Sequence, residues 1–296
     1  MIRIGTAGWS FPDWEGIVYP SGKAGARAAL GVLSGLFDTL EINSSFYRPP
    51  APRISEGWAR RVESSPAFMF TAKLWQGFTH DRGQEHRDEE AACKEGFRPL
   101  QRAGRLGTVL AQFPHSFHHS ASGAGYLERL LDRFSEFPLA VELRHDSWLT
   151  DAAMKMLELR QVAFCNLDQP QIGATVPPTT IVTAPTAYVR MHGRNGEAWF
   201  DKEADRDSRY DYLYSLDEIG QWAERVRLMQ GRTKEIFIIA NNHYRGQAVA
   251  NALELAHALT GVQRVIPPGL LAAFPRLASV ASGSTPPDRA QGRLPL

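Results

Sequence analysis

Cysteine is scarce in this sequence, which has two in 296 residues, Cys93 and Cys165. One lies in a charged helical pattern and the other in an apolar strand pattern, so we expect no disulfide framework, and a reducing compartment suits both. Long hydrophobic runs are also lacking, because no stretch approaches the ~18 apolar residues that a membrane-spanning helix needs. The first residues show no basic segment followed by a long apolar run, as a signal peptide would. We therefore expect a cytoplasmic protein without a membrane partner.

An excess of charge of one sign is missing too. Lys plus Arg number 33 and Asp plus Glu 32, so the net charge of +1 gives no global field for nucleic acid. The sequence contains no GxGxxG, GxxxxGK(S/T), HExxH, CxxC or GxSxG motif. Common dinucleotide, P-loop, zinc and serine-hydrolase signatures therefore give no support, and we assign no metal, no cofactor and no oligomeric state.

Short apolar runs are what the sequence does have, and they recur at regular intervals. The runs are IRIGT (2–6), DTLEIN (38–43), AFMFTAK (67–73), LGTVLAQF (106–113), PLAVELRH (138–145), VAFCNLD (162–168), AYVRMH (187–192) and EIFIIANN (235–242). Helical patterns lie between them; Ser215 and Glu218 form a capping box, and Gly261 ends the last helix, over about 246–259. Eight strand and helix units in about 250 residues predict a single α/β domain, a (β/α)8 TIM barrel with parallel strands.

The composition changes near the end of the chain. From about Pro267 the sequence is rich in Pro, Ser, Gly and Ala. We therefore divide it into a barrel domain over 1–265 and an extension over 266–296, and we expect residues 281–296 to be disordered.

Seven motifs in a fixed order carry a resemblance to a known family. They are IGTAGWSFPDWEGIVYP, EINSSFYRPP, FTAKLWQGFTH, LAQFPHSF, AVELRHDSW, YVRMHGRN and ANNHYRGQAVANALEL. Over about residues 2–260 the chain resembles the YecE-like family, catalogued as domain of unknown function 72. The resemblance implies a (β/α)8 barrel and does not imply a particular reaction.

Three acid–base candidates stand at the carboxyl ends of predicted strands, where barrel enzymes build their sites. Glu41 and Glu142 lie near the ends of the second and fifth strands, where ionised groups are rarely placed for stability. His192 ends the seventh strand, and histidine titrates near neutral pH. We predict these three as catalytic residues. The competing interpretation is an inward polar layer whose charges pair with one another.

A larger set is predicted to bind the ligand. Arg144 shares a strand face with Glu142, and Arg190 with His192, and guanidinium groups clamp phosphate or carboxylate. We consider three alternative roles for Lys73: it binds an anion, acts as a base or only neutralises a nearby glutamate. The predicted binding residues are Asn43, Tyr47, Lys73, Trp75, Arg144, Trp148, Arg190, Asn241 and Asn242. The aromatic residues suit a sugar ring or a nucleobase, and so do Trp199, Tyr210 and Tyr214, or they only pack their loops.

Three hypotheses for function follow from these residues. The first is an enzyme, a hydrolase, lyase or isomerase, that acts by acid–base chemistry on a small phosphorylated, carboxylated or sugar-like molecule. The second is a metal-dependent phosphoesterase or nuclease with ligands from Glu41, Glu142, Asp168, His192 and His243, although nearby cations repel a metal. The third is a non-catalytic protein that binds a metabolite, nucleic acid or protein partner in the same mouth.

Overall fold

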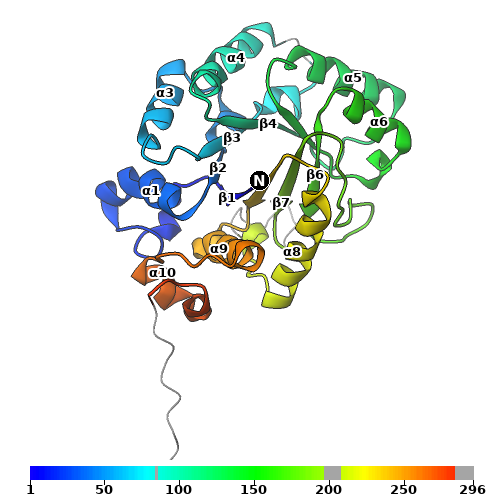
Figure 1. Ribbon diagram of the computed structural model, residues 1–296. Helices are drawn as coiled ribbons and strands as arrows, with labels where there is room; N and C mark the ends of the chain where they lie inside the picture. Colours follow the sequence, from blue (N-terminus) through cyan, green and yellow to red (C-terminus); the bar gives the residue numbers. More distant parts are fainter. Residues whose placement is uncertain (84–85, 197–207, 284–296) are drawn as a thin grey trace, which may run out of the picture.

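Eight short apolar segments form the parallel strands of a closed barrel, in which each strand pairs with its sequence neighbours and β8 pairs with β1 (Figure 1). The structure is a computed structural model that describes residues 1–83, 86–196 and 208–283. The strands are β1 (Ile2–Ala7), β2 (Thr39–Ile42), β3 (Met69–Lys73), β4 (Leu106–Gln112), β5 (Leu139–Glu142), β6 (Ala163–Asp168), β7 (Thr186–Met191) and β8 (Glu235–Ala240). The (β/α)8 barrel predicted from the sequence is confirmed.

Helices surround the barrel (Figure 1). The α-helices are α1 (Gly22–Leu36), α2 (Ser44–Tyr47), α3 (Pro52–Arg61), α4 (Arg87–Arg102), α5 (Ala121–Arg133), α6 (Asp151–Leu159), α8 (Leu216–Gln230), α9 (Gln247–Thr260) and α10 (Pro268–Ala273). Short 3-10 helices are η1 (Pro12–Trp14), η2 (Gln76–Phe78), η3 (Asp146–Trp148), η4 (Ser208–Tyr210), η5 (Tyr244–Gly246) and η6 (Pro275–Ser279). None of the helices in the described ranges is long and apolar enough to cross a membrane.

Local sequence signals set several helix boundaries. The capping box at the start of α8 is present, because the Ser215 hydroxyl accepts from the Glu218 amide and the Glu218 carboxylate accepts from the Ser215 amide. Thr150 caps α6 by accepting from the amide of Ala153. At the other end of α9, Gly261 has a φ of 69°, a left-handed conformation that favours glycine.

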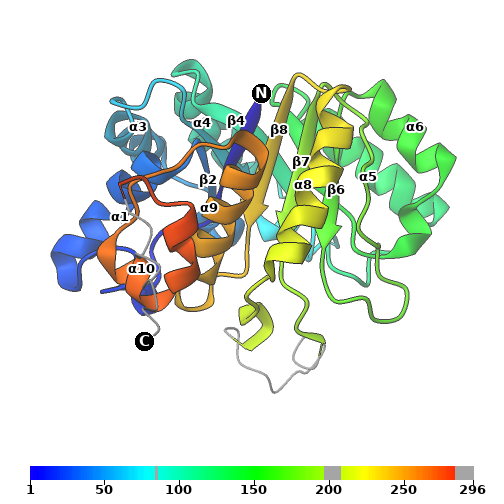
Figure 2. The same cartoon turned by 60° about the horizontal axis from the view of Figure 1, so that its bottom comes forward.

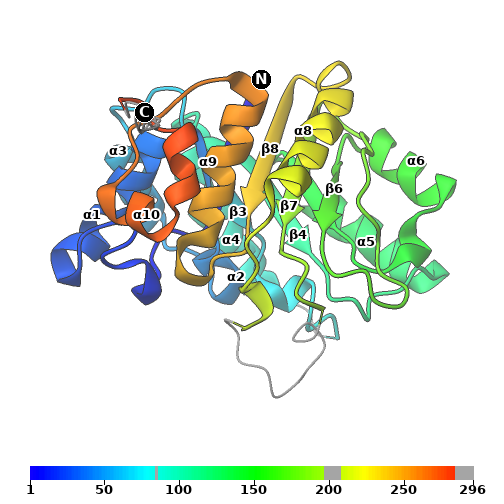
Figure 3. The same cartoon turned by 90° about the horizontal axis from the view of Figure 1, so that it is seen from below.

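Strand alternation divides the side chains into two layers. Outward residues such as Leu40, Ile42 and Val109 are fully buried in the large apolar cluster between strands and helices. Inward residues on several strands form a second, smaller apolar cluster that includes Leu110 and Phe237. Several polar and charged inward residues lie near the carboxyl ends, and these ends share one face of the barrel, as Figure 3 shows.

The fifth strand is shorter than the predicted run over 138–145, because β5 ends at Glu142. The chain then leaves the barrel sheet and pairs with the loop that follows β6. The amide of Val176 donates to the carbonyl of Arg144, and His145 forms an antiparallel bridge with Thr175. Arg144 therefore belongs to a loop beyond the strand.

The segment after residue 265 is packed on the barrel over the part that the structure describes. Helix α10 and η6 lie beside α9 and α1 (Figure 2), and Leu270 and Leu277 are fully buried in the main apolar cluster. The guanidinium of Arg276 pairs with the carboxylate of Glu254 in α9, 2.7 Å away. Residues 284–296, most of the predicted disordered tail, lie outside the described residues.

Candidate functional site at the carboxyl ends of the strands

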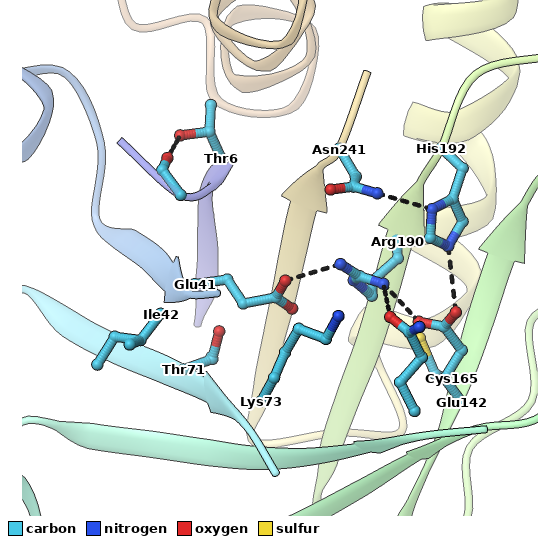
Figure 4. A network of polar contacts seen from close by, with 12 residues as sticks. Thr6, Glu41, Ile42, Thr71, Lys73, Glu142, Cys165, Arg190, His192 and Asn241 are labelled. Carbon is cyan, nitrogen blue, oxygen red and sulfur yellow. Dashed lines mark hydrogen bonds and ion pairs between the residues drawn. The ribbon is translucent and has the colours of Figure 1, made fainter. Parts of the chain in front are cut away.

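Inward polar side chains from several strands meet at the carboxyl end of the barrel. Figure 4 shows Glu41 of β2, Lys73 of β3, Glu142 of β5 and Arg190 of β7 pointing toward a common centre. Each has an exposed fraction of 8% or less. We call this group the mouth network and count with it the residues that bond to it.

Arg190 is the centre of the mouth network. Its Nη2 lies 2.7 Å from Oε1 of Glu41, and its Nη1 lies 2.6 Å from Oε2 of Glu142. Nη1 also donates to Oε1 of Gln112 at 3.0 Å. One guanidinium thus pairs with two buried carboxylates, which suits its planar set of five donors.

Glu142 forms ion pairs with two arginines. Nε of Arg144 donates to its Oε1 at 2.7 Å, in addition to the Arg190 contact. Burial raises the pKa of Glu142, but the charges of Arg190, Arg144 and His192 outweigh burial and hold the pKa well below its usual range. Glu142 is therefore an ionised, fully paired carboxylate at neutral pH.

His192 lies beside Glu142 and away from solvent. Its Nε2 is 3.4 Å from Oε1 of Glu142, and its Nδ1 is 2.9 Å from the side-chain nitrogen of Asn241. With the amide as donor to Nδ1, the ring proton is on Nε2 and faces Glu142. Burial lowers the pKa of His192 to about 3 despite the attraction of Glu142, so the ring is neutral at physiological pH.

Tyr188 contacts Glu41, the other carboxylate of the network. Its hydroxyl donates to Oε2 of Glu41 at 2.9 Å and lies 2.8 Å from Oγ1 of Thr71. Burial raises the pKa of Tyr188 well above its usual value, so the hydroxyl keeps its proton. The prediction for strand ends did not include Tyr188, because it lies in the middle of β7.

Lys73 differs from the other charged residues of the network. Among the described residues no carboxylate lies within 4.0 Å of its Nζ, which instead lies 3.7 Å from the centre of the Phe46 ring. Burial, and next the charge of Arg190, lower the pKa of Lys73 to about 7. Lys73 therefore exchanges protons near neutral pH.

A cavity of about 410 Å³ lies above the mouth network. Its polar surface comes from Asn43, Ser44, Lys73, Gln112, Arg190 and Asn241. Its aromatic walls come from Trp9, Phe11, Phe46, Tyr47 and Tyr210, with His80 and His243. Burial, and next the charge of Lys73, lower the pKa of His80 to about 4, so this ring is neutral at pH 7. The cavity therefore has the size and the mixed character of a small-molecule site.

The structure thus separates the predicted site residues into groups. Asn43, Tyr47, Lys73, Arg190 and Asn241 line the cavity. The predicted catalytic residues Glu41, Glu142 and His192 meet in the mouth network, fully buried and outside the cavity lining, and Arg144 joins them. Glu41 and Glu142 pair with Arg190, and His192 lies beside Glu142, whereas Lys73 lines the cavity itself.

The other predicted binding residues lie outside the cavity. Trp148 is in the apolar core, where Nε1 donates to the carbonyl of Phe117. Asn242 is buried and donates to Asn251, and Trp75 lines a neighbouring groove with Trp58. Strand spacing alone does not distinguish these core and groove positions from positions in the cavity lining.

Further candidates make contacts elsewhere in the fold. Asp168 points away from the barrel centre and pairs with Arg194, and the Trp222 indole donates to it. Tyr214 is buried and accepts from the amide of Gly193, and Trp199 lies outside the described residues.

The ligand set of the metal hypothesis is dispersed. Glu41 and Glu142 are occupied by Arg190, Asp168 faces the helix layer, and His243 stacks on Phe11 with ring centres 4.6 Å apart. Within the described ranges, no three His, Cys, Asp or Glu side chains gather as metal ligands would.

Several cavity residues were missed by strand spacing. Trp9 and Phe11 belong to the loop after β1, and Phe46 belongs to α2. Gln112 ends β4 with its side chain inward, so its strand parity was an available signal.

The fold and its mouth define a (β/α)8 barrel protein with a charge-paired network beneath a cavity at the carboxyl ends of the strands. The chain belongs to the family described as "Protein of unknown function DUF72", whose model matches residues 3–274. The resemblance to the YecE-like family is confirmed, and the match continues past residue 265.

Known relatives match this chain over most of their length. A solved structure of a DUF72 family protein from Thermotoga maritima is 35% identical, with 88% of this chain and 99% of that chain covered and a TM-score of 0.79. One from Enterococcus faecalis is 27% identical, with 88% and 95% covered and a TM-score of 0.77. The UPF0759 protein YunF of Bacillus subtilis is 29% identical over 273 residues, covering 88% of this chain and 95% of the relative.

Proposed function

We propose that the chain is an enzyme that binds a small anionic molecule in the cavity and transfers a proton through Lys73. The observation that carries this proposal is the position of Lys73, which is buried at the cavity without a carboxylate partner among the described residues. A buried cation without an ion pair is costly, and an anionic ligand supplies the missing charge.

A count of charges supports an anion. Arg144, Arg190 and protonated Lys73 bring three positive charges, and Glu41 and Glu142 bring two negative charges, which leaves one positive charge in excess. A phosphate or carboxylate group balances that charge. The aromatic walls suit a sugar-like or other ring-shaped body, because such rings stack on aromatic faces.

The pKa of Lys73 supports proton transfer. A base works best when its pKa is near the working pH, and burial places the pKa of Lys73 at about 7. The neutral amine accepts a proton from the ligand, and the ammonium returns one. Glu41 and Glu142 hold Arg190 in place, and neutral His192 orients Glu142.

Thermal unfolding with added small molecules tests the anion site. The probes are sodium phosphate, glycerol 3-phosphate and pyruvate, with glycerol as the uncharged control. A bound anion at 100 times its Kd raises the free energy of unfolding by about 2.7 kcal/mol, and we expect Lys73→Met to abolish this gain. Lys155→Met is the matched control, because the Lys155 side chain is 67% exposed. Equal stabilisation of Lys73→Met and the native chain would contradict the proposal.

Lys73→Arg separates binding from catalysis. Arginine keeps the positive charge but does not release its proton at neutral pH, so binding remains while turnover falls by about 10²–10⁴-fold. An anion that stabilises the protein and is never converted would instead support the binding-protein hypothesis.

A further inference from the structure

We propose that Lys73 is a covalent nucleophile whose Nζ forms an imine with an aldehyde or ketone that also carries an anionic group. This inference deepens the proposed function and rests on the same cavity. It assigns a substrate class, small anionic carbonyl compounds.

The position of Lys73 is fixed by its backbone and by the neighbouring helix. It is the last residue of β3, and its carbonyl accepts from the hydroxyl of Ser45, 2.7 Å away. Its Nζ lies 3.7 Å from the centre of the Phe46 ring at the cavity wall. In Figure 4 the amine points toward Arg190 and Glu41, and no dashed line ends on it. The backbone of Lys73 is therefore held, while its Nζ lies at the cavity that a ligand would occupy.

The nitrogen has the protonation state that nucleophilic attack needs. An ordinary lysine has a pKa of about 10.4, so roughly one amine in 2,500 is neutral at pH 7. Burial and Arg190 lower the pKa of Lys73 to about 7, so about half of the Lys73 amines are neutral at that pH. Desolvation next to a cation is a recognised way to activate a lysine for imine formation.

The reaction balances without a further reactant. The neutral Nζ attacks the carbonyl carbon, and the carbon–oxygen π bond opens to give a carbinolamine. The carbon–oxygen single bond then breaks, and the oxygen leaves as water with the two hydrogens that the amine has lost. The product is a carbon–nitrogen double bond, and no oxidant or reductant is consumed.

The charges of the mouth network favour an anionic carbonyl compound. When Lys73 is neutral, Arg144 and Arg190 balance Glu41 and Glu142. Protonation of the imine adds one positive charge in a buried place, and a carboxylate or phosphate on the same ligand compensates it. An uncharged carbonyl compound lacks this compensation.

Reductive trapping tests the inference. The probe is pyridoxal 5′-phosphate, an aromatic aldehyde with a phosphate group, which is incubated with the full chain at pH 7 and reduced with sodium borohydride. Peptide mass mapping then compares the six lysines of the chain, Lys23, Lys73, Lys94, Lys155, Lys202 and Lys234. We expect Lys73 to be labelled at least ~10-fold faster than exposed Lys155, because its neutral fraction is so much larger.

The pH dependence and two variants sharpen the test. Labelling of Lys73 should rise through a midpoint at about pH 7, whereas labelling of Lys155 rises only toward pH 10. Lys73→Met and Lys73→Arg should lose the adduct, and Lys155→Met should keep it. Sodium phosphate should slow labelling of Lys73 alone. A circular-dichroism melt of each variant shows that it is folded.

The outcomes separate this inference from the proposed function. If phosphate stabilises the native chain but not Lys73→Met, and no reduced adduct forms at Lys73, the imine is excluded and the anion site stands. If Lys73 is labelled no faster than Lys155, the imine is also excluded. If the adduct forms selectively at Lys73 but no anion stabilises the protein, the imine stands and the anion site falls.

Discussion

At the scale of single residues, burial decides which charged groups of the mouth network can titrate. Arg190 remains charged because burial is outweighed by Glu41 and Glu142, and these hold its pKa well above the ordinary value. Lys73 has no such partner within the described residues, and its pKa falls to about 7. Lys73 therefore titrates near neutral pH while Arg190 stays charged, a difference that the residue types alone do not predict.

Arg190→Met tests the structural weight of the mouth network. The variant leaves two buried carboxylates without their common cation, which costs about 3–5 kcal/mol in the free energy of unfolding at pH 7. Arg227→Met removes an exposed pair with Glu224, 2.5 Å away, and should cost less than about 1 kcal/mol. Urea unfolding measures both.

The cost of Arg190→Met should also depend on pH. In the native chain the pKa of Glu142 is below its unfolded value, so its ion pairs stabilise the fold above about pH 4.3 and lose this effect as pH falls through the folded pKa. In Arg190→Met, protonation of the two carboxylates removes the negative charge that the lost guanidinium no longer balances. The difference in the free energy of unfolding between the native chain and Arg190→Met should therefore be smaller at pH 4 than at pH 7. An unchanged difference would contradict this account.

At the scale of elements, the junction of β2, α2 and β3 places Lys73 and Phe46 together. The Ser45 hydroxyl is the link, because it lies 2.8 Å from the carbonyl of Ile42 and 2.7 Å from that of Lys73. Two strand ends and one short helix are thus tied through a single buried side chain.

Ser45→Ala tests this junction. Loss of the hydroxyl leaves buried carbonyl groups without that donor, so we expect the free energy of unfolding to fall by about 1–3 kcal/mol. The neighbouring Ser44 is exposed, and Ser44→Ala should change stability by about 0.5 kcal/mol or less. Chemical denaturation compares the two variants, and equal effects would show that the Ser45 link is not needed.

Elements also show how far the sequence carries a prediction. The strand positions followed from apolar runs, and the boundaries of β6 and β8 differ little from the runs 162–168 and 235–242. Alternation also brought Glu142 and His192 to one place, 3.4 Å apart. These features depend only on local pattern and on the parallel order of strands.

Other parts of the site depend on contacts between distant segments. The hydrogen bond from Tyr188 to Glu41 joins β7 to β2, and the one from Arg190 to Gln112 joins β7 to β4. Local spacing contains no information on such pairs. Local spacing also does not show that Trp148 fills the core, because an aromatic residue in the segment after a strand can either pack or bind a ligand.

At the scale of the whole molecule, the carboxyl-terminal segment closes the outer layer near the start of the chain. The side chain of Leu270 approaches Gly246, and a Cβ on Gly269 would lie 2.2 Å from the carbonyl of Gly16. Arg264 forms a bridge with Ala281, which connects the end of the segment to the residues before it. Residues on both sides of position 265 thus share one apolar cluster.

Leu270→Ala tests whether this segment unfolds with the barrel. Leu270 is fully buried in the main apolar cluster, so its truncation should lower the free energy of unfolding by about 2–5 kcal/mol. Val265 is 79% exposed, and Val265→Ala should change it by about 0.5 kcal/mol or less. Both proteins should unfold in one transition by calorimetry. A shared core transmits the loss of one side chain to the whole barrel, so the single transition of Leu270→Ala should move to lower temperature. A separate low-temperature transition, with the main transition unchanged, would instead show that the segment melts independently.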